Sequence, residues 1–202
     1  MGDERRLGIN GRSREFFGDT LRDPERYGSE SEKELVLKLR SIRLVAMSFC
    51  GVLTPPYVDL DEKGKRTFRL SQRDLLAVEV LKKKEFRVMV LSNRHAVVRK
   101  RCERMDIECF AADQVAEANG KDGLLRKILW GTDILMENVL YVGDEINDLA
   151  VMGLAGVAVA VNDAAPEVRD AADYITITRG GEHAVREVAE MLLATHGKKF
   201  EL

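Results

Sequence analysis

Reactive and small side chains lie at or past the carboxyl end of an apolar run near residues 42–49. They are Ser48, Cys50, Gly51 and Thr54. The run is almost continuously apolar rather than alternating, which is typical of a parallel strand buried on both faces. In open α/β sheets, ligands bind at the carboxyl ends of such strands, where the strand order reverses. The sequence therefore predicts a binding site at the end of this strand.

Polar side chains also follow two later apolar runs. The tripeptide 92–94 (Ser-Asn-Arg) comes after FRVMVL, and Asp144 and Asp148 come after residues 139–142. Lys121 opens an intervening helical pattern. Hydroxyl and cationic groups bind phosphate oxygens, and carboxylates bind magnesium. Taken singly, a serine after a strand is usually a turn residue and an aspartate after a glycine usually a helix cap. Only the combination favours phosphate chemistry.

The elements that must position these groups alternate along the chain. After an irregular tail, the patterns predict a helix near 29–40, the strand just described, a hairpin within 57–70, helices near 71–84, 95–105, 114–130, 146–153, 165–171 and 181–196, and strands near 86–91, 107–111, 139–142, 157–161 and 174–177. Such alternation indicates an α/β fold with a doubly wound parallel sheet and right-handed crossovers. We expect an N-terminal extension over 1–40 (tail plus helix) and a core domain over 41–202, with a β-hairpin insert after the first strand and no large cap domain.

Bulk properties narrow the possibilities further. A chain of 202 residues can bury one good core. A net charge of −2 gives no electrostatic reason to expect a nucleic-acid or membrane partner, and no apolar stretch approaches the roughly 20 residues of a membrane span. Three cysteines (Cys50, Cys102 and Cys109) are too few and too irregular for a disulfide framework. A cytoplasmic protein is the simplest expectation.

The motifs together resemble the haloacid dehalogenase superfamily of phosphohydrolases. Gly-Val-Leu-Thr at 51–54 matches the end of its first motif, and YVGDEINDLAVM its fourth. The similarity is closest to the capless branch that includes 3-deoxy-D-manno-octulosonate 8-phosphate phosphatase and the C-terminal domain of animal CMP-sialic acid synthetases. It covers about residues 42–197, including LSQRD after the hairpin and GGEHAVREV near the end. The resemblance implies a homotetramer in which hairpins pack subunits together, and a phosphate or substrate site formed by Gly51, Thr54, Ser92, Asn93, Arg94 and Lys121.

The first motif departs from the family pattern at two positions. Ser48 stands where the family has its aspartate nucleophile, and Cys50 where it has the aspartate that acts as acid and base. A serine hydroxyl with no base beside it is a poor substitute for an ionised carboxylate. Cysteine phosphatases place an arginine six positions after the nucleophile, whereas this chain has Pro56 there. The catalytic positions Ser48, Cys50 and Lys121 are therefore expected to form a degenerate site.

The resemblance assigns the metal to Asp144 and Asp148. With the first aspartate replaced, we expect this site to be weakened and any binding of Mg²⁺ to be weak, because magnesium requires near-octahedral oxygen ligands. With fewer carboxylates around it, Lys121 is expected to pair directly with Asp144 and partly replace the cation.

Three functions remain open. The first is a sugar-phosphatase homologue with lost or greatly weakened activity that binds a small phosphorylated sugar or a phosphate anion, or acts in assembly. The alternative is an active magnesium-dependent phosphatase of a phosphorylated sugar acid such as 3-deoxy-D-manno-octulosonate 8-phosphate. A Rossmann-type cofactor binder is the third, although no GxGxxG follows the first strand.

Overall fold

A six-stranded parallel sheet forms the centre of the molecule. The computed structural model describes residue 21 and residues 29–64, 66–92 and 96–202. The strands of the sheet lie in the order β5-β4-β1-β6-β7-β8. They are β1 (Leu44–Met47), β4 (Arg87–Leu91), β5 (Glu108–Phe110), β6 (Val139–Gly143), β7 (Val157–Ala160) and β8 (Tyr174–Ile175). All neighbouring pairs in this sheet are parallel.

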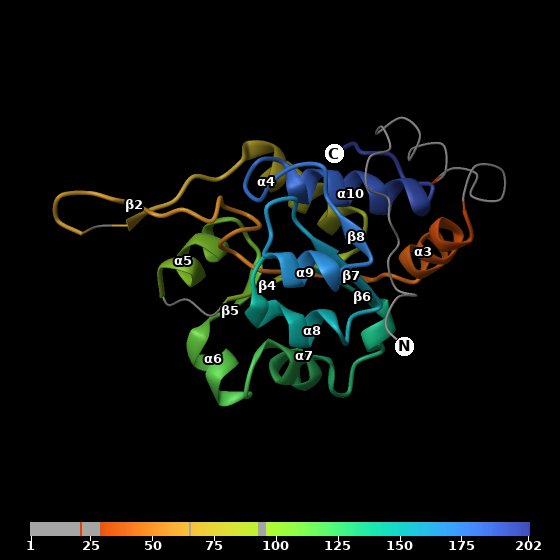
Figure 1. Ribbon diagram of the computed structural model, residues 1–202, viewed down its shortest axis with the longest axis horizontal. Helices are drawn as coiled ribbons and strands as arrows, with labels where there is room; N and C mark the ends of the chain where they lie inside the picture. Colours follow the sequence, from red (N-terminus) through yellow and green to blue (C-terminus); the bar gives the residue numbers. More distant parts are fainter. Residues whose placement is uncertain (1–20, 22–28, 65, 93–95) are drawn as a thin grey trace.

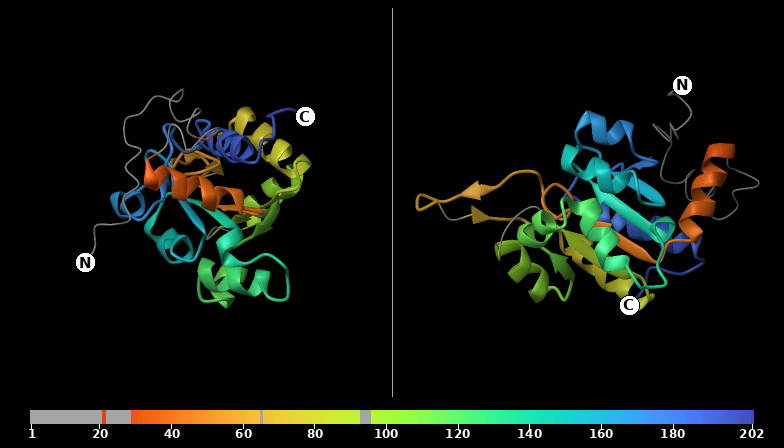
Figure 2. Two further views of the ribbon diagram at one scale, coloured as in Figure 1. Left: turned by 90° about the vertical axis from the view of Figure 1, so that its right-hand side faces the viewer. Right: turned by 90° about the horizontal axis from the view of Figure 1, so that it is seen from below.

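Helices cover both faces of the sheet (Figure 1). They are α3 (Glu30–Arg40), α4 (Gln72–Lys83), α5 (Ala96–Arg104), α6 (Ala112–Glu117), α7 (Lys121–Leu129), α8 (Leu149–Met152), α9 (Pro166–Asp170) and α10 (Ala184–Thr195), with short 3-10 helices η1 (Met136–Asn138) and η2 (Ile146–Asp148). Helices α4 and α10 lie together on one face, and α7 and α8 on the other (Figure 2). The predicted doubly wound α/β fold is therefore confirmed.

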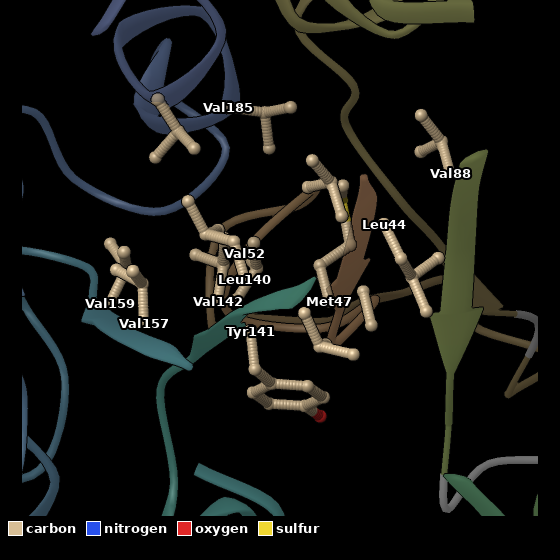
Figure 3. Close-up of a cluster of buried hydrophobic side chains, with 14 of the residues drawn as sticks. Leu44, Met47, Val52, Val88, Leu140, Tyr141, Val142, Val157, Val159 and Val185 are labelled. Carbon is tan, nitrogen blue, oxygen red and sulfur yellow. The ribbon is translucent and has the colours of Figure 1, made fainter. Parts of the chain in front are cut away.

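The core is built from the strands and the inward sides of these helices. All four residues of β1 and all five of β6 are buried. Figure 3 shows Val185 of α10 approaching the sheet from one side, while the ring of Tyr141 points to the opposite side. Three apolar residues of α3, Leu35, Val36 and Leu39, belong to the same buried cluster. Leu21, from the tail, is also part of it, at 5% exposure. The rest of the predicted tail, residues 1–20 and 22–28, lies outside the described residues.

Two predicted helix starts are confirmed by their caps. The Ser29 side chain accepts a hydrogen bond from the Glu32 amide at the start of α3, and Ser71 accepts one from the Asp74 amide at the start of α4. Such side chains satisfy amides that have no partner within the helix. The predicted hairpin is also present, as β2 (Asp59–Leu60) paired antiparallel with β3 (Arg66–Thr67), and it projects away from the body of the molecule (Figure 1).

The prediction of a single helix over 114–130 is wrong. The chain forms two helices, because Asn119 and Gly120 take positive φ angles of 59° and 122° and the Gly120 amide turns back to donate to the Val115 carbonyl at 2.9 Å. This break sets Lys121 at the first position of α7. The last helix also starts later than predicted, at Ala184, because Gly181 and His183 take positive φ angles of 71° and 84°.

Candidate functional site

The site lies where the strand order reverses. From β1 the chain moves outward through β4 to β5, and then crosses to β6 on the other side of β1. Residues at and after the ends of β1, β4 and β6 line one cavity of about 150 Å³, together with Lys121 at the start of α7. The lining residues are Ser48, Phe49, Cys50, Gly51, Pro56, Leu91, Ser92, Lys121, Asp144, Glu145 and Asn147. The structure thus brings together Ser48, Cys50, Gly51, Ser92, Lys121 and Asp144, as the strand pattern predicts.

Three of the predicted phosphate-site residues are not among the residues that line this cavity. Thr54 is buried, and its hydroxyl donates to the Pro55 carbonyl at 3.0 Å rather than lining the cavity. This hydrogen bond lies within the turn after β1. Asn93 and Arg94 lie outside the described residues, so their predicted contact with phosphate stays a prediction.

Lys121 and Asp148 form a buried ion pair in the site. The Lys121 ammonium lies 2.5 Å from Oδ1 of Asp148, and the two side chains are 4% and 0% exposed. The sequence-based expectation that Lys121 pairs with Asp144 is therefore wrong. The 3-10 helix η2 turns Asp148 inward beneath Gly143, where a Cβ atom would lie 2.8 Å from the Asp148 Cβ, so Asp148 rather than Asp144 meets the lysine.

Ser48 is held inside this ion pair. Lys121 Nζ donates to Ser48 Oγ at 2.7 Å, and the same hydroxyl donates to the Asp148 carboxylate at 2.9 and 3.0 Å. The residue is only 3% exposed. Its proton already has an acceptor, and its oxygen already accepts from a cation, so the hydroxyl is oriented but not ionised.

Tyr141 completes the network, although it was not among the residues predicted from the sequence. Tyr141 lies in the middle of β6 and is fully buried. Its hydroxyl donates to Asp148 Oδ1 at 2.7 Å. Burial and the nearby Asp148 charge raise the pKa of this phenol well above its usual value. A buried tyrosine hydroxyl normally needs a hydrogen-bond partner, so a tyrosine within an apolar strand was the available signal.

Asp148 has no oxygen left for another ligand. In addition to the contacts above, Oδ2 accepts from the backbone amides of Asp144 at 3.0 Å and Glu145 at 3.3 Å. Burial raises the pKa of the Asp148 carboxyl, but the charge of Lys121 and the hydrogen bonds outweigh this effect and hold the pKa below its usual value. Asp148 is thus a weak base and serves as the structural centre of the network.

Asp144 lies at the edge of the cavity, in a different electrostatic environment. Burial and the neighbouring Asp148 charge raise its pKa to about 7, although Lys121 acts in the opposite direction. Within the described ranges, no group of three or more His, Cys, Asp or Glu side chains could hold a metal ion. Because Asp148 is fully engaged, the residues present do not fit a firmly held magnesium ion. Asp144 could supply only one carboxylate to it.

We expect Asp144 to make stability depend on pH. Between about pH 4 and pH 7 the folded chain holds a proton on Asp144 that the unfolded chain has lost, so the free energy of unfolding falls as pH rises through this window. Asp144→Asn should therefore be more stable than wild type at pH 8 by about 2 to 4 kcal/mol and nearly equal to it at pH 4.

Urea unfolding in EDTA across pH 4–8 measures this difference, with Glu62→Gln on the exposed hairpin as a control for the loss of one charge. Parallel stability profiles for wild type and Asp144→Asn would contradict the prediction.

Gly51 allows the turn after β1 to approach Asp144. It has a φ of 80°, and a Cβ atom there would lie 1.8 Å from Asp144 Oδ2. The C-terminal loop closes over the same turn, because the Gly181 amide donates to the Val52 carbonyl at 2.7 Å and a Cβ on Gly180 would lie 1.8 Å from the Gly51 oxygen. The glycines of both segments therefore determine the shape of the cavity wall.

Gly51→Ala is expected to lower the free energy of unfolding by about 2 to 4 kcal/mol, through overlap with Asp144 and the cost of a positive φ. Gly131→Ala is the matched control, because Gly131 has a φ of 76° and no described atom within 4 Å of its Cβ position. Equal losses in chemical denaturation would show that overlap with Asp144 contributes nothing.

The Arg-Asp and Gly-Gly motifs singled out in the sequence meet beside this turn. Asp74 is fully buried, and its carboxylate accepts from the backbone amides of His183 at 3.1 Å and Arg186 at 2.8 Å. The His183 ring contacts the Ser71 hydroxyl at 2.8 Å through Nδ1. Burial raises the pKa of Asp74, against the effect of these hydrogen bonds. Asp74 thus joins the start of α4 to the start of α10.

Known proteins resemble this chain in sequence and in fold. Residues 120–188, which include Lys121, Asp144 and Asp148, match the family model for haloacid dehalogenase-like hydrolases. The chain is 33% identical over 176 residues to the 3-deoxy-D-manno-octulosonate 8-phosphate phosphatase KdsC of Escherichia coli, covering 87% of this chain and 91% of that protein.

Two solved structures are similar over most of their length. The phosphatase of Moraxella catarrhalis, in complex with a magnesium ion, a phosphate ion and KDO, superposes with a TM-score of 0.74 at 26% identity, covering 81% of this chain and 92% of that one. The cobalt-bound phosphatase YrbI of Haemophilus influenzae gives 0.72 at 29% identity, covering 79% and 92%. The chain therefore belongs to the haloacid dehalogenase-like hydrolases, as a homologue of the KdsC-type sugar phosphatases.

Proposed function

We propose that this chain binds the phosphate group of a small phosphorylated sugar, or free phosphate, in the cavity at the end of β1, and that its phosphatase activity is lost or greatly weakened. The single observation that supports the loss of activity is the hydrogen bonding of the Ser48 hydroxyl. Its hydroxyl donates to Asp148 and accepts from Lys121, in the position where the family it resembles has a carboxylate nucleophile.

The chemistry of the network supports this proposal. A hydroxyl becomes an effective nucleophile when a strong base takes its proton. Asp148, the acceptor of the Ser48 proton, has a pKa held below its usual value by Lys121 and the hydrogen bonds, despite burial. Moving that proton to Asp148 would also disrupt the ion pair with Lys121. Cys50, in the acid/base position, lies at the cavity edge and is only partly buried.

Binding of a phosphate group requires only room and hydrogen-bond donors, and no nucleophile. The cavity of about 150 Å³ is several times the roughly 30 Å³ that a water molecule occupies in the liquid, so it suits a phosphate group better than a whole sugar phosphate. Ser92, Lys121 and turn amides supply donors to an anion at this strand edge. The sugar would then extend past Pro56, Glu145 and Asn147 at the cavity mouth.

Sequence similarity favours a second candidate, an active magnesium-dependent phosphatase of a phosphorylated sugar acid. The Escherichia coli relative and the Moraxella catarrhalis structure are 3-deoxy-D-manno-octulosonate 8-phosphate phosphatases. The Moraxella catarrhalis phosphatase is in complex with magnesium, phosphate and KDO. A magnesium ion in this chain would rest mainly on Asp144 and water. When bound, it would neutralise charge on the phosphate.

Two measurements on the wild-type chain separate the candidates. Phosphate release from 3-deoxy-D-manno-octulosonate 8-phosphate is followed with and without magnesium, and sulfate or phosphate binding is followed by calorimetry. The proposal expects anion binding that Ser92→Ala weakens, with turnover near background. Turnover at ordinary enzymic rates, about 1 per second or faster, would establish the second candidate instead. Absence of anion binding together with turnover at background would overturn both.

We also propose that the chain forms a homotetramer through its hairpin. The hairpin projects from the body of the molecule (Figure 2), and Leu60 and Tyr57 are 65% and 79% exposed there. Contiguous exposed apolar surface marks interaction sites, and the family resemblance of the sequence implies a hairpin that packs subunits together. Light scattering should give a tetramer for wild type and a smaller species for Leu60→Asp, while Leu37→Asp, which removes an exposed leucine from α3, should leave the mass unchanged.

A further inference from the structure

Cys102 and Cys109 lie together outside the site, on α5 and on β5. Neither is in a disulfide. Cys102 is fully buried, whereas Cys109 is partly exposed. Their thiols are hydrogen-bonded to each other. The pair therefore combines a partly exposed thiol with a fully buried thiol that interacts with it.

The turn between them fixes this arrangement. The Ile107 amide donates to the Cys102 carbonyl at 2.9 Å, and the Asp106 amide to the Glu103 carbonyl at 3.1 Å, while Asp106 takes a positive φ of 51°. These two bonds form a Schellman motif, which ends a helix in a defined reversal. The chain thus returns along α5 into β5, and Cys109 pairs in register with Val90 of β4.

The electrostatic surroundings favour reaction at Cys109. The hydrogen bond from Cys102 and the nearby Arg99 charge lower the pKa of Cys109, against the effects of burial and Glu103. The hydrogen bond to Cys109 and burial raise the pKa of Cys102. A partly exposed thiol with a lowered pKa next to a second cysteine is the arrangement that reacts with peroxides.

We propose that Cys102 and Cys109 are an oxidisable thiol pair, in which hydrogen peroxide oxidises Cys109 and Cys102 then closes a disulfide between α5 and β5. In the first step the Cys109 sulfur attacks a peroxide oxygen, the O–O bond breaks, and the leaving hydroxide takes a proton to form water. In the second step the Cys102 sulfur attacks the sulfenic sulfur, the S–O bond breaks, and the hydroxyl leaves with the Cys102 proton as water. One peroxide is reduced to two waters for each disulfide formed.

This bond would form next to the candidate site. The Phe110 carbonyl, one residue after Cys109, accepts the Ser92 amide at 2.9 Å, and Ser92 lines the cavity. A covalent link between α5 and β5 would therefore fix the strand that supports Ser92.

The test treats the reduced full-length chain with increasing hydrogen peroxide and maps its thiols by alkylation and peptide mass spectrometry. We expect Cys102 and Cys109 to be lost together, as one linked peptide lacking two hydrogen atoms, with recovery in dithiothreitol. Cys102→Ser should leave a dimedone-reactive sulfenic acid on Cys109. Cys109→Ser should leave Cys102 reduced, and Cys50→Ser should form the link as wild type does.

Three results would overturn the proposal. These are oxidation of Cys50 while the pair remains reduced, crosslinks only between chains, and equal peroxide sensitivity of Cys102 in wild type and Cys109→Ser. None of these readouts depends on phosphatase activity or anion binding, so they test the thiol pair separately from the proposed function.

Discussion

Replacing Ser48 and Cys50 together by aspartate is expected to raise magnesium-dependent phosphatase activity at least about 100-fold above the wild-type chain. The position of Ser48, between Lys121 and Asp148, is already suited to a carboxylate, because Lys121 Nζ lies 2.7 Å from Ser48 Oγ. With a divalent cation beside it, a carboxylate there would be ionised at neutral pH and would need no base. Aspartate at position 50 would add an acid and base at the cavity edge.

The double variant should also acquire a stronger requirement for magnesium. Asp148 lies about 3 Å from the position of Ser48 Oγ, so a second carboxylate would share one lysine with it, and a divalent cation would relieve the repulsion. Phosphate release measured against magnesium concentration tests both effects.

Ser48→Asn with Cys50→Asn is the matched control, because it introduces similar shapes without charge. It should stay at background. Equal activity well above background in wild type and in the aspartate variant would show that positions 48 and 50 do not limit turnover, which would favour the second candidate function.

Lys121→Met is expected to destabilise the fold by about 3 to 5 kcal/mol, because it leaves the Asp148 carboxylate buried without its cation. Asp148 is 0% exposed, so water cannot take the place of the ammonium. Combining Lys121→Met with Asp148→Asn removes both charges and should recover part of the loss. Urea unfolding at pH 7 measures all three variants.

The effect should depend on pH in a defined direction. The pKa of Asp148 is lower in the folded chain than its ordinary value, because Lys121 and the hydrogen bonds outweigh burial. Its stabilising contribution is therefore fully present above about pH 4 and is lost as pH falls through the folded pKa. The difference between wild type and Asp148→Asn should shrink accordingly below pH 4.

An exposed ion pair provides the control for Lys121. Arg43 and Asp133 lie 2.8 Å apart but are 49% and 79% exposed, and such pairs contribute at most about 1 kcal/mol. Arg43→Met should therefore cost much less than Lys121→Met. If the two variants lowered the free energy of unfolding by similar amounts, burial would not make the Lys121–Asp148 pair contribute more than an exposed pair.

The sequence by itself determined the alternation of strands and helices along the chain and the edge at which the site forms. Apolar runs that end in polar residues specify parallel strands locally, and side chains that follow such runs must gather at one edge. Ser48, Ser92 and Asp144 were predictable for this reason. Ser71, and one of Ser29 or Ser31, were predictable as caps because capping depends on residues within one helical turn.

Only the tertiary structure decided which charges meet. Lys121 and Asp148 are separated by 27 positions in sequence, and the turn of η2 selects Asp148 over Asp144. The Tyr141 hydroxyl, the raised pKa of Asp144 and the contact of the C-terminal glycines with the Gly51 turn likewise depend on burial and long-range contacts. Sequence periodicity reports which side of an element is apolar, but not the distances between polar atoms, and those distances set the chemistry of this site.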